Sequence, residues 1–470
     1  MDLMPPRTGR ITISDAAGED TRKWIDSLPM TGHAGLRRVR DHYEGGPASI
    51  SDDYFRMPDG MERRDWRRAK QLLTHVNLVR PSVRCWTSAI YSGDVSRVIT
   101  ANPHRDAVDT WVHSYQYEQA VEAWCENAVA YGTAVAMPAI GLDGLLTTWL
   151  PDPLYTWIMT DPGDLRRVTA IAEVRKERIV YATLAGQGWA TADRQMHTPW
   201  NPAWLPVAMA YGQDRRHCGE VYGLPLVGDA VEWSIRATDL MFNITLLQKL
   251  QTRAVLVMIG EVEESDRTDG WGGSKVMKLS RDSDAKFISP DPKIRETIDI
   301  LKEVIGILAT ATSIPQDVLD ATLTQSVSSA EAARIRAIPL VQRARQLVPA
   351  WRAYEQDLIL AATGVLEYRA SLNPINLSDL RARTTTDVQI TPNIIPMSPN
   401  ELTQDLIARV AAGLISPEDA LRRLYPTKTP EEIASMAERV RELQDRAGGP
   451  QAMAQNAVKV AAGAGSDAPA

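Results

Sequence analysis

Hydrophobic residues recur at helical spacing between residues 294 and 308. The members of this stripe are Ile294, Ile298, Leu301, Ile305 and Leu308, separated by four, three, four and three positions. Residues three or four positions apart share one face of a helix, so the pattern predicts an amphipathic helix over 293–312. A stripe this narrow suits a seam between neighbouring helices, including helices of different subunits. The simpler alternative is an ordinary amphipathic helix on a globular core.

A second helix is predicted upstream, over residues 230–253. Its apolar positions include Val231, Ile235, Leu240, Ile244 and Leu247. Between the two helices, residues 254–259 are apolar and partly β-branched, and residues 275–288 alternate as in a strand. They flank an acidic, glycine-rich segment, so the pattern predicts two helical rods joined by a small β-rich tip.

The chain before residue 230 contains two further patterns. Residues 107–131 have one apolar side and are followed by Gly132, the residue type expected at a left-handed helix C-cap. From 133 to 211, short apolar stretches alternate with Asp-Gly, Asp-Pro and Gly-Gln-Gly breaks, as in strands joined by turns. The first half therefore predicts an α+β body with a helical layer and a strand-rich layer.

A long helix is predicted after the second rod. Ser328 and Glu331 have the spacing of a capping box, and the helix that they open extends to about residue 362. Pro339 and Pro349 lie within it, and each removes one backbone hydrogen bond. We therefore expect kinks at both prolines, with three separate helices as the alternative.

The C-terminal part begins with a strand at 387–390 that returns to the body. Three short helices are then predicted, because Ser398, Ser416 and Thr429 each stand before a proline and an acidic first turn. Beyond them, residues 448–470 are rich in Ala, Gly and Gln, and we expect this tail to be disordered.

Composition limits the functional classes. The formal net charge is −7 and the pI is about 5.7, which excludes a generic polyanion-coating protein. Three scattered cysteines favour synthesis in a reducing cytoplasm. The N-terminal residues do not resemble a signal peptide. The most apolar stretch, 129–142, is interrupted by glycines and a proline and is too short to span a membrane.

The sequence predicts no catalytic, cofactor-binding or metal site, and hence no enzyme. The seven histidines form no HExxH pair, and no serine lies in a GxSxG elbow. Gly270, Gly272 and Gly273 lack the order of a phosphate-binding loop and are predicted to be turn residues. Asp152, Asp161 and Asp164 stand beside prolines and are also expected to form turns.

In their order along the chain, several short segments resemble the portal proteins of long-tailed bacteriophages, over about residues 37–446. The matching segments are Tyr43–Gly45, Asn77–Val83, Tyr131–Ala134, Pro151–Tyr155, Leu205–Val207, Tyr222–Leu226, Ser313–Pro315, Ser326–Ala332 and Ala412–Ser416. Each is only three to seven residues long, so the specificity lies in their order and in the rod–tip–rod insert.

The resemblance implies an α+β portal fold: a mixed α/β wing, a helical stem, a small β-rich clip, a long kinked helix and a helical crown, in a ring-forming subunit. The implied ranges are 1–229 for the first part of the wing, 230–253 for the first stem helix, 254–292 for the clip, 293–312 for the second stem helix, 313–397 for the tunnel loop, long helix and return to the wing, and 398–447 for the crown.

The resemblance also implies a function. A ring of about twelve copies would stand at one capsid vertex of the virion, with the major capsid protein and scaffold around it. Double-stranded DNA would pass non-specifically through its bore during packaging by the terminase large subunit, be retained, and leave through the tail. The ring would also be the attachment site of a head–tail adaptor. No membrane is involved.

Three sets of site residues follow from this resemblance. The uncharged Thr322, Thr324, Gln325 and Ser326 would line the DNA channel on the tunnel loop. The acidic Glu261, Glu263, Glu264 and Asp266 of the clip would face terminase or the adaptor. The stripe from Ile294 to Leu308 would be the stem seam.

Two alternatives remain open. One is another structural phage protein that forms no closed ring. The other is a hydrolase or transferase that uses the strand layer at 134–211, which predicts a compact monomer or dimer with a pocket containing perturbed carboxylates or histidines.

Overall fold

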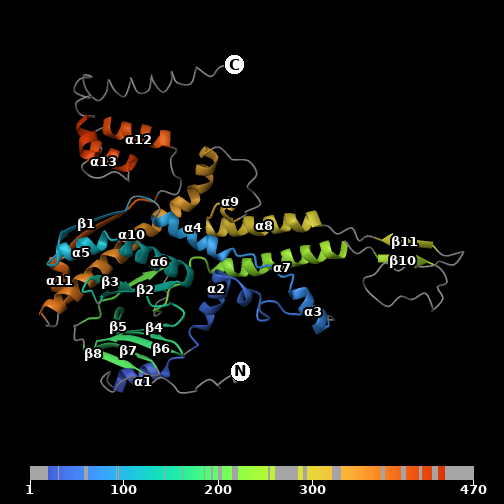
Figure 1. The fold of residues 1–470 in the computed structure, drawn as a ribbon, viewed down its shortest axis with the longest axis horizontal. Helices are drawn as coiled ribbons and strands as arrows, with labels where there is room; N and C mark the ends of the chain where they lie inside the picture. The colour runs from blue at the N-terminus through green and yellow to red at the C-terminus, as the bar shows by residue number, and fades with distance from the viewer. Residues whose placement is uncertain are drawn as a thin grey trace, which may run out of the picture. The chain divides into compact units, whose positions relative to one another are not determined.

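The chain has a mixed α+β fold in a computed structural model (Figure 1). The structure describes residues 19–29, 31–57, 62–91, 93, 95–141, 143–161, 163–184, 186–191, 194–199, 204–213, 221–251, 255–259, 284–288, 294–319, 330–371, 376–392, 399–411, 415–425 and 432–439. The chain divides into two compact units, Met1–Ile394 and Ile395–Ala470.

The first unit contains both helices and strands along most of its length. Its helices are α1 (Glu19–Ser27), α2 (Ala34–Glu44), the 3-10 helix η2 (Pro47–Ile50), α3 (Arg63–Lys70), α4 (Val79–Tyr91), α5 (Arg105–Val112), α6 (Tyr115–Tyr131), α7 (Gly228–Gln251), α8 (Ile294–Thr312), α9 (Gln316–Leu319), α10 (Ala330–Ser371) and α11 (Leu377–Arg383). Its strands are β1 (Val95–Ala101), β2 (Thr133–Ile140), β3 (Leu146–Trp149), β4 (Thr156–Asp161), β5 (Asp164–Val174), β6 (Arg178–Thr183), β7 (Gly186–Thr191), β8 (Gln195–Pro199), β9 (Ala208–Tyr211), β10 (Val255–Ile259), β11 (Asp284–Ile288) and β12 (Thr385–Ile390).

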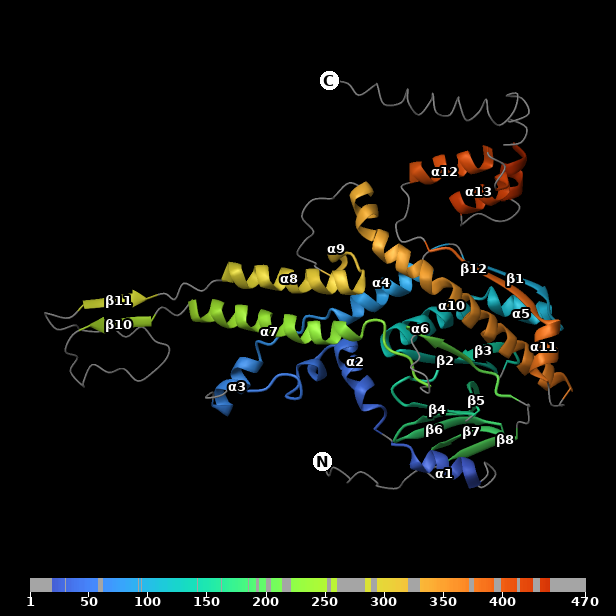
Figure 2. The same ribbon diagram turned by 180° about the vertical axis from the view of Figure 1, so that it is seen from behind.

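The strand-rich layer predicted from residue 133 to 211 is confirmed as two sheets. One has the strand order β3-β2-β9 and the other β4-β5-β6-β7-β8. Adjacent residues of a strand point to opposite faces of its sheet, and β5 uses both faces. Ile171 packs with Val135 of β2, whereas Ala172 packs with Ile25 of α1. Helix α1 therefore covers one face of the five-stranded sheet, and the three-stranded sheet packs on the other (Figure 2).

Strand β12 includes the strand predicted at 387–390. It pairs antiparallel with β1 from Val95↔Ile390 to Ala101↔Thr385, with one irregularity between Ile99 and Ala101. The returning segment thus completes a two-stranded sheet with a strand from the first quarter of the chain, and α7 and α8 lie between the two strands in sequence.

The principal core lies where α10 crosses α4, α6 and the β2–β9 pair. Trp124 of α6 stands nearly perpendicular to Trp351 of α10, with ring centroids 5.8 Å apart. Tyr354 packs edge-on against Trp351 at 5.4 Å. The indole N–H of Trp124 donates to the carbonyl oxygen of Ala134 at 3.0 Å, so this buried donor is paired.

The ends of α6 are set by local chemistry. At its start, the hydroxyl of Ser114 accepts a hydrogen bond from the backbone N–H of Tyr117. At its end, Gly132 has φ 87°, which confirms the predicted C-cap. A Cβ at this position would lie 2.3 Å from the carbonyl oxygen of Gly223, so only glycine allows the chain to pass at this point.

Helix α10 is one continuous helix of 42 residues, so the alternative of three separate helices is wrong. Pro339 and Pro349 both lie inside it, and the helix changes direction in its N-terminal part in both views (Figures 1 and 2). The side chains of Leu340, Ala344 and Val348 are buried in the core, and this burial offsets the hydrogen bonds that the prolines remove.

The second unit contains the described helices α12 (Pro399–Ala411) and α13 (Pro417–Leu424), and a further helical stretch at 432–439. The Ser416 hydroxyl accepts a hydrogen bond from the N–H of Asp419 at 3.1 Å, which confirms the predicted cap. Leu406, Ala420 and Ile433 are buried within this unit. Ser398, Thr429 and the tail at 448–470 lie outside the described residues.

Candidate functional site

Helices α7 and α8 are paired. They lie side by side in both views, and the β10–β11 hairpin lies beyond the same ends of the two helices (Figures 1 and 2). The hairpin strands are antiparallel, from Val255↔Ile288 to Ile259↔Asp284. The two helices lie close to the ranges predicted for the rods, and the described strands of the tip fall within 254–259 and 275–288.

The stripe of α8 passes from the protein core to solvent. Leu308 is fully buried and Ile305 is 5% exposed, and both belong to the principal core. Leu301 is half-buried against the same core, and Ile298 is 37% exposed. Ile294 is the first residue of α8, and its side chain lies outside the described part. The C-terminal half of the stripe therefore packs on its own chain.

The opposite face of α8 carries a second apolar pair that the sequence reasoning missed. Ile300 is 48% exposed and Ile307 is 52% exposed, although both are large aliphatic side chains. They are seven residues apart, which places them on one helix face, and the exposed Asp299 and Glu303 lie to one side of them. The seven-residue interval was visible in the sequence, but only the fold shows that this face is left uncovered.

Two buried hydroxyl groups hold the base of α7. Ser234 accepts a hydrogen bond from the N–H of Leu78 at 3.0 Å, and Thr238 accepts one from the N–H of Val76 at 3.0 Å. These two amides belong to the chain that enters α4, where they would otherwise be buried without partners. The first part of α7 is therefore fixed to the body, although the two segments are more than 150 residues apart.

A buried ion pair joins α10 to the β1 strand. The Nε atom of Arg97 lies 2.6 Å from the Glu355 carboxylate, with side chains 7% and 0% exposed. Burial acts to lower the pKa of Arg97, but the charge of Glu355 and its hydrogen bond outweigh this and raise the pKa. Burial, and then the charge of Glu355, raise the pKa of Tyr117, whose hydroxyl also reaches that carboxylate. The Glu355 carboxylate therefore favours the charged form of the buried Arg97 side chain.

A histidine pair links α2 to the segment before α4. Nδ1 of His42 lies 3.1 Å from Nε2 of His75, and His42 is fully buried beside the ring of Tyr54. Among the described residues, Nε2 of His42 has no hydrogen-bond partner. Burial, then the charges of His75 and Arg38, lower the pKa of His42 to about 4, and burial also lowers that of His75.

We expect this pair to make stability depend on pH. An unfolded histidine binds a proton near pH 6.5, whereas folded His42 binds one only near pH 4. Its contribution is therefore fully present above about pH 6.5 and is lost as the pH falls toward 4. His42→Asn should flatten the decrease in unfolding free energy between about pH 7 and pH 5, measured by urea unfolding. His113→Asn, at an exposed position, is the control, and equal slopes for wild type and His42→Asn would contradict the assignment.

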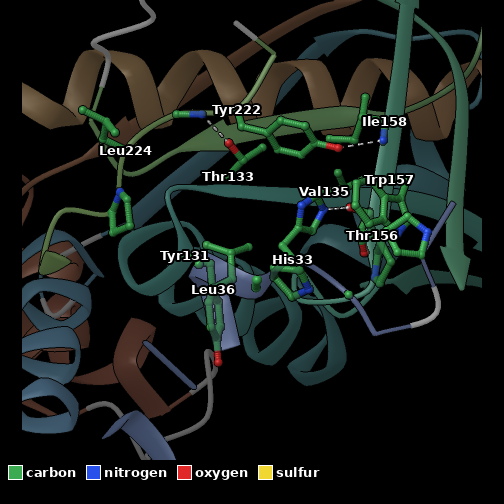
Figure 3. Close-up of a pocket in the computed structure, with 18 of the residues that line it drawn as sticks. His33, Leu36, Tyr131, Thr133, Val135, Thr156, Trp157, Ile158, Tyr222 and Leu224 are labelled. Carbon is green, nitrogen blue, oxygen red and sulfur yellow. Dashed lines mark hydrogen bonds between the residues drawn. The ribbon is translucent and has the colours of Figure 1, made fainter. Parts of the chain in front are cut away.

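A cavity of about 650 Å³ lies beside the strand layer, between the α2 entry, β4 and the residues before α7 (Figure 3). His33 Nε2 lies 2.8 Å from the carbonyl oxygen of Thr156, and its ring lies 3.8 Å from that of Trp157. The Tyr222 hydroxyl accepts from the N–H of Ile158 at 3.1 Å. Among the described lining residues there is one histidine, no carboxylate, serine or cysteine, and a set of threonine and tyrosine hydroxyl groups.

The other residues predicted for the site lie outside the described residues. These are the tunnel-loop residues Thr322, Thr324, Gln325 and Ser326, and the clip residues Glu261, Glu263, Glu264 and Asp266. Their roles stay predictions. Within the described residues, no group of three His, Cys, Asp or Glu side chains is placed to hold a metal ion. None of the helices described there has the length and apolar character needed to cross a membrane.

Comparisons with known proteins give likeness in structure. No protein-family model and no curated protein matches the chain. Several solved chains are similar to it, among them these three. One is from the virion of a native gene transfer agent (GTA) particle, at 14% identity, covering 82% of this chain and 98% of that chain with a TM-score of 0.37. One is from the neck of an empty GTA particle computed with C6 symmetry, at 14% identity, covering 86% of this chain and 96% of that chain with a TM-score of 0.40. One is from the neck of a native GTA particle computed with C12 symmetry, at 12% identity, covering 84% of this chain and 95% of that chain with a TM-score of 0.37.

Proposed function

We propose that the chain is a portal-type subunit of a phage-like particle, which forms a closed ring of about twelve copies around a DNA channel. The ring would stand at one capsid vertex. It would pass DNA during packaging by the terminase large subunit, retain it, release it through the tail and bind a head–tail adaptor. The subunit itself would catalyse no reaction.

One observation carries this proposal: a helix pair fixed to the body at its base, with an apolar face left open. The buried stripe of α8 already packs on its own chain, so Ile300 and Ile307 are not needed for the internal core. Exposed aliphatic side chains on one face of a fixed helix are typical of a protein–protein contact. When each copy contacts the next through two different surfaces, the contact repeats and can close into a ring.

The charge of the chain suits a DNA conduit. A bore lined with Lys and Arg would form many phosphate contacts and hold the duplex in a salt-dependent way. A net charge of −7 per subunit gives a wall that adheres weakly to DNA. In this proposal Thr322, Thr324, Gln325 and Ser326 contact the duplex without fixing it, and Glu261, Glu263, Glu264 and Asp266 face a basic surface of terminase or the adaptor.

The proposal predicts that the double variant Ile300→Asp, Ile307→Asp prevents ring formation. The purified wild type should give rings with a central hole in negative-stain images. Placing two carboxylates in a desolvated contact should lower the assembled fraction at least about tenfold, measured by mass photometry.

Leu145→Asp is a matched control, because Leu145 is 66% exposed but lies at the turn before β3, far from α8 in sequence. Its rings should be like those of the wild type. If the wild type is a compact monomer or dimer, the portal proposal is wrong, and a structural protein without a ring or an enzyme that uses the strand layer takes its place.

A further inference from the structure

Helix α3 presents a basic surface that is firmly held on α7. Trp66 packs edge-on against Phe242 of α7, with ring centroids 6.1 Å apart at 89°. Phe55 and Leu73 complete this buried cluster, and Lys70 is paired with Asp52 at 2.6 Å. The position of α3 is therefore set by aromatic packing, independently of its other charges.

Four arginines of α3 remain exposed. Arg63, Arg64, Arg67 and Arg68 form two pairs at i, i+4 spacing, and none has an ion pair or hydrogen bond with a described residue. Like charges at this spacing destabilise a helix by a few tenths of a kcal/mol. In a chain of net charge −7, this short helix thus carries a concentration of positive charge that nothing described in the same chain neutralises.

A cavity of about 570 Å³ lies between α3 and α7, and Trp66 is the residue of α3 that lines it. Aromatic side chains form much of its wall: Tyr54, Phe55, Trp66, Trp233 and Phe242. Its charged lining residues are Arg56, Arg236, Asp229, Glu232 and Asp239, and Glu232 is already paired with Arg38 at 2.6 Å. The surface therefore has two parts: a recess with aromatic walls, which can take aliphatic side chains, and a separate row of cations on α3, which can take the carboxylates of a partner.

The outer face of α8 has the matching chemistry. Ile300 and Ile307 are exposed, and the exposed Asp299 and Glu303 form no ion pair with a described residue. Asp299 and Glu303 are four positions apart, as are Arg63 and Arg67, the two arginines nearest to Trp66 around α3, so both charge pairs have an axial spacing of about 6 Å. The basic Arg295 and Lys302 of α8 lie next to Asp299 around the helix, four positions before it and three after it, on the side away from Ile300 and Ile307.

These two surfaces cannot meet within one chain. In both views α3 lies on one side of α7 and α8 lies on the other (Figures 1 and 2). We propose that the outer face of α8 (Asp299, Ile300, Glu303 and Ile307) binds the α3 surface of a second copy of this chain, with the carboxylates on the arginines and the isoleucines at the aromatic recess. The contact is head-to-tail, so it repeats, and it rests on the proposed ring.

A charge-swap experiment on the full chain tests this pairing. Reversing one side, with Arg63→Glu and Arg67→Glu or with Asp299→Arg and Glu303→Arg, places like charges in contact and should lower the ring fraction at least about tenfold. Combining all four changes should restore rings to within about threefold of the wild type. Lys176→Glu with Arg178→Glu, on the exposed β5–β6 turn, changes the net charge equally to the arginine variant and should form normal rings.

The outcomes separate the two proposals. If wild-type rings form and either reversed variant assembles normally, this pairing is wrong while the ring proposal stands. Loss of rings without rescue by the four changes also overturns the pairing. If the arginine variant forms rings but loses binding to a fluorescent 20-base-pair duplex, the surface binds nucleic acid instead. If the wild type forms no ring at all, the proposed function itself fails.

Discussion

Replacing Glu355 with glutamine is expected to lower the free energy of unfolding by about 3 to 5 kcal/mol. Glutamine keeps the volume of the side chain but removes its charge, so the guanidinium of Arg97 stays buried with no counter-charge 2.6 Å away. Most of the cost comes from this unpaired charge, because a buried ion has lost its hydration. The measurement is urea unfolding at pH 7, followed by circular dichroism at a protein concentration that keeps the chain monomeric.

A surface pair of the same length gives the control. Lys23 and Glu19 also lie 2.6 Å apart, but their side chains are 70% and 71% exposed. Glu19→Gln should cost less than about 1 kcal/mol, because solvent screens this pair. The two variants therefore differ in burial rather than in distance. Similar losses for both would show that the Arg97–Glu355 pair is not buried as described.

The second large effect is expected for Trp351→Ala. This side chain is 1% exposed and stands edge-on to Trp124, Tyr354 and Tyr91 at centroid distances of 5.4 to 5.9 Å. Truncation removes these contacts and leaves a cavity where α10 crosses α6, so the unfolding free energy should fall by about 3 to 5 kcal/mol. Urea unfolding measures the loss, and Trp351→Phe should recover part of it.

Ile335→Ala, on the same helix, is the control for Trp351→Ala. Ile335 is 61% exposed, so its truncation should change the unfolding free energy by no more than about 0.5 kcal/mol. A loss below about 1 kcal/mol for Trp351→Ala would mean that the core does not depend on this crossing.

Local patterns predict much of the secondary structure. The stripe from Ile294 to Leu308 predicts α8, because apolar residues repeat at helical spacing in each turn of this segment. Gly132 predicts the end of α6 because glycine readily adopts the positive φ that a helix C-cap often needs, and this depends on one residue alone. The strands between 133 and 211 follow from turn residues in the same way. In each case the cause lies within a few positions of its effect.

The arrangement of these elements depends on contacts between distant residues, and the sequence does not reveal them. In the sequence, nothing near Arg97 or Glu355 distinguishes them from ordinary surface charges, yet the two side chains form a buried ion pair. The four arginines of α3 indicate only a strongly charged helix. The sequence around them does not show that α8 carries residues of complementary charge. Helix α10 shows a mixed case, because local proline chemistry leaves open whether the helix kinks or breaks, and its buried side chains keep it continuous. The tunnel-loop and clip residues stay predictions from resemblance alone.

The pairing of β1 with β12 bears on how the protein is made. β1 leaves the ribosome about 300 residues before its partner, and translation at roughly 5 to 20 residues per second leaves an unpaired strand edge open for about 15 to 60 seconds. An open edge is a template for mispairing with other nascent chains. Expression at lower temperature or with a holdase chaperone should therefore raise the soluble yield.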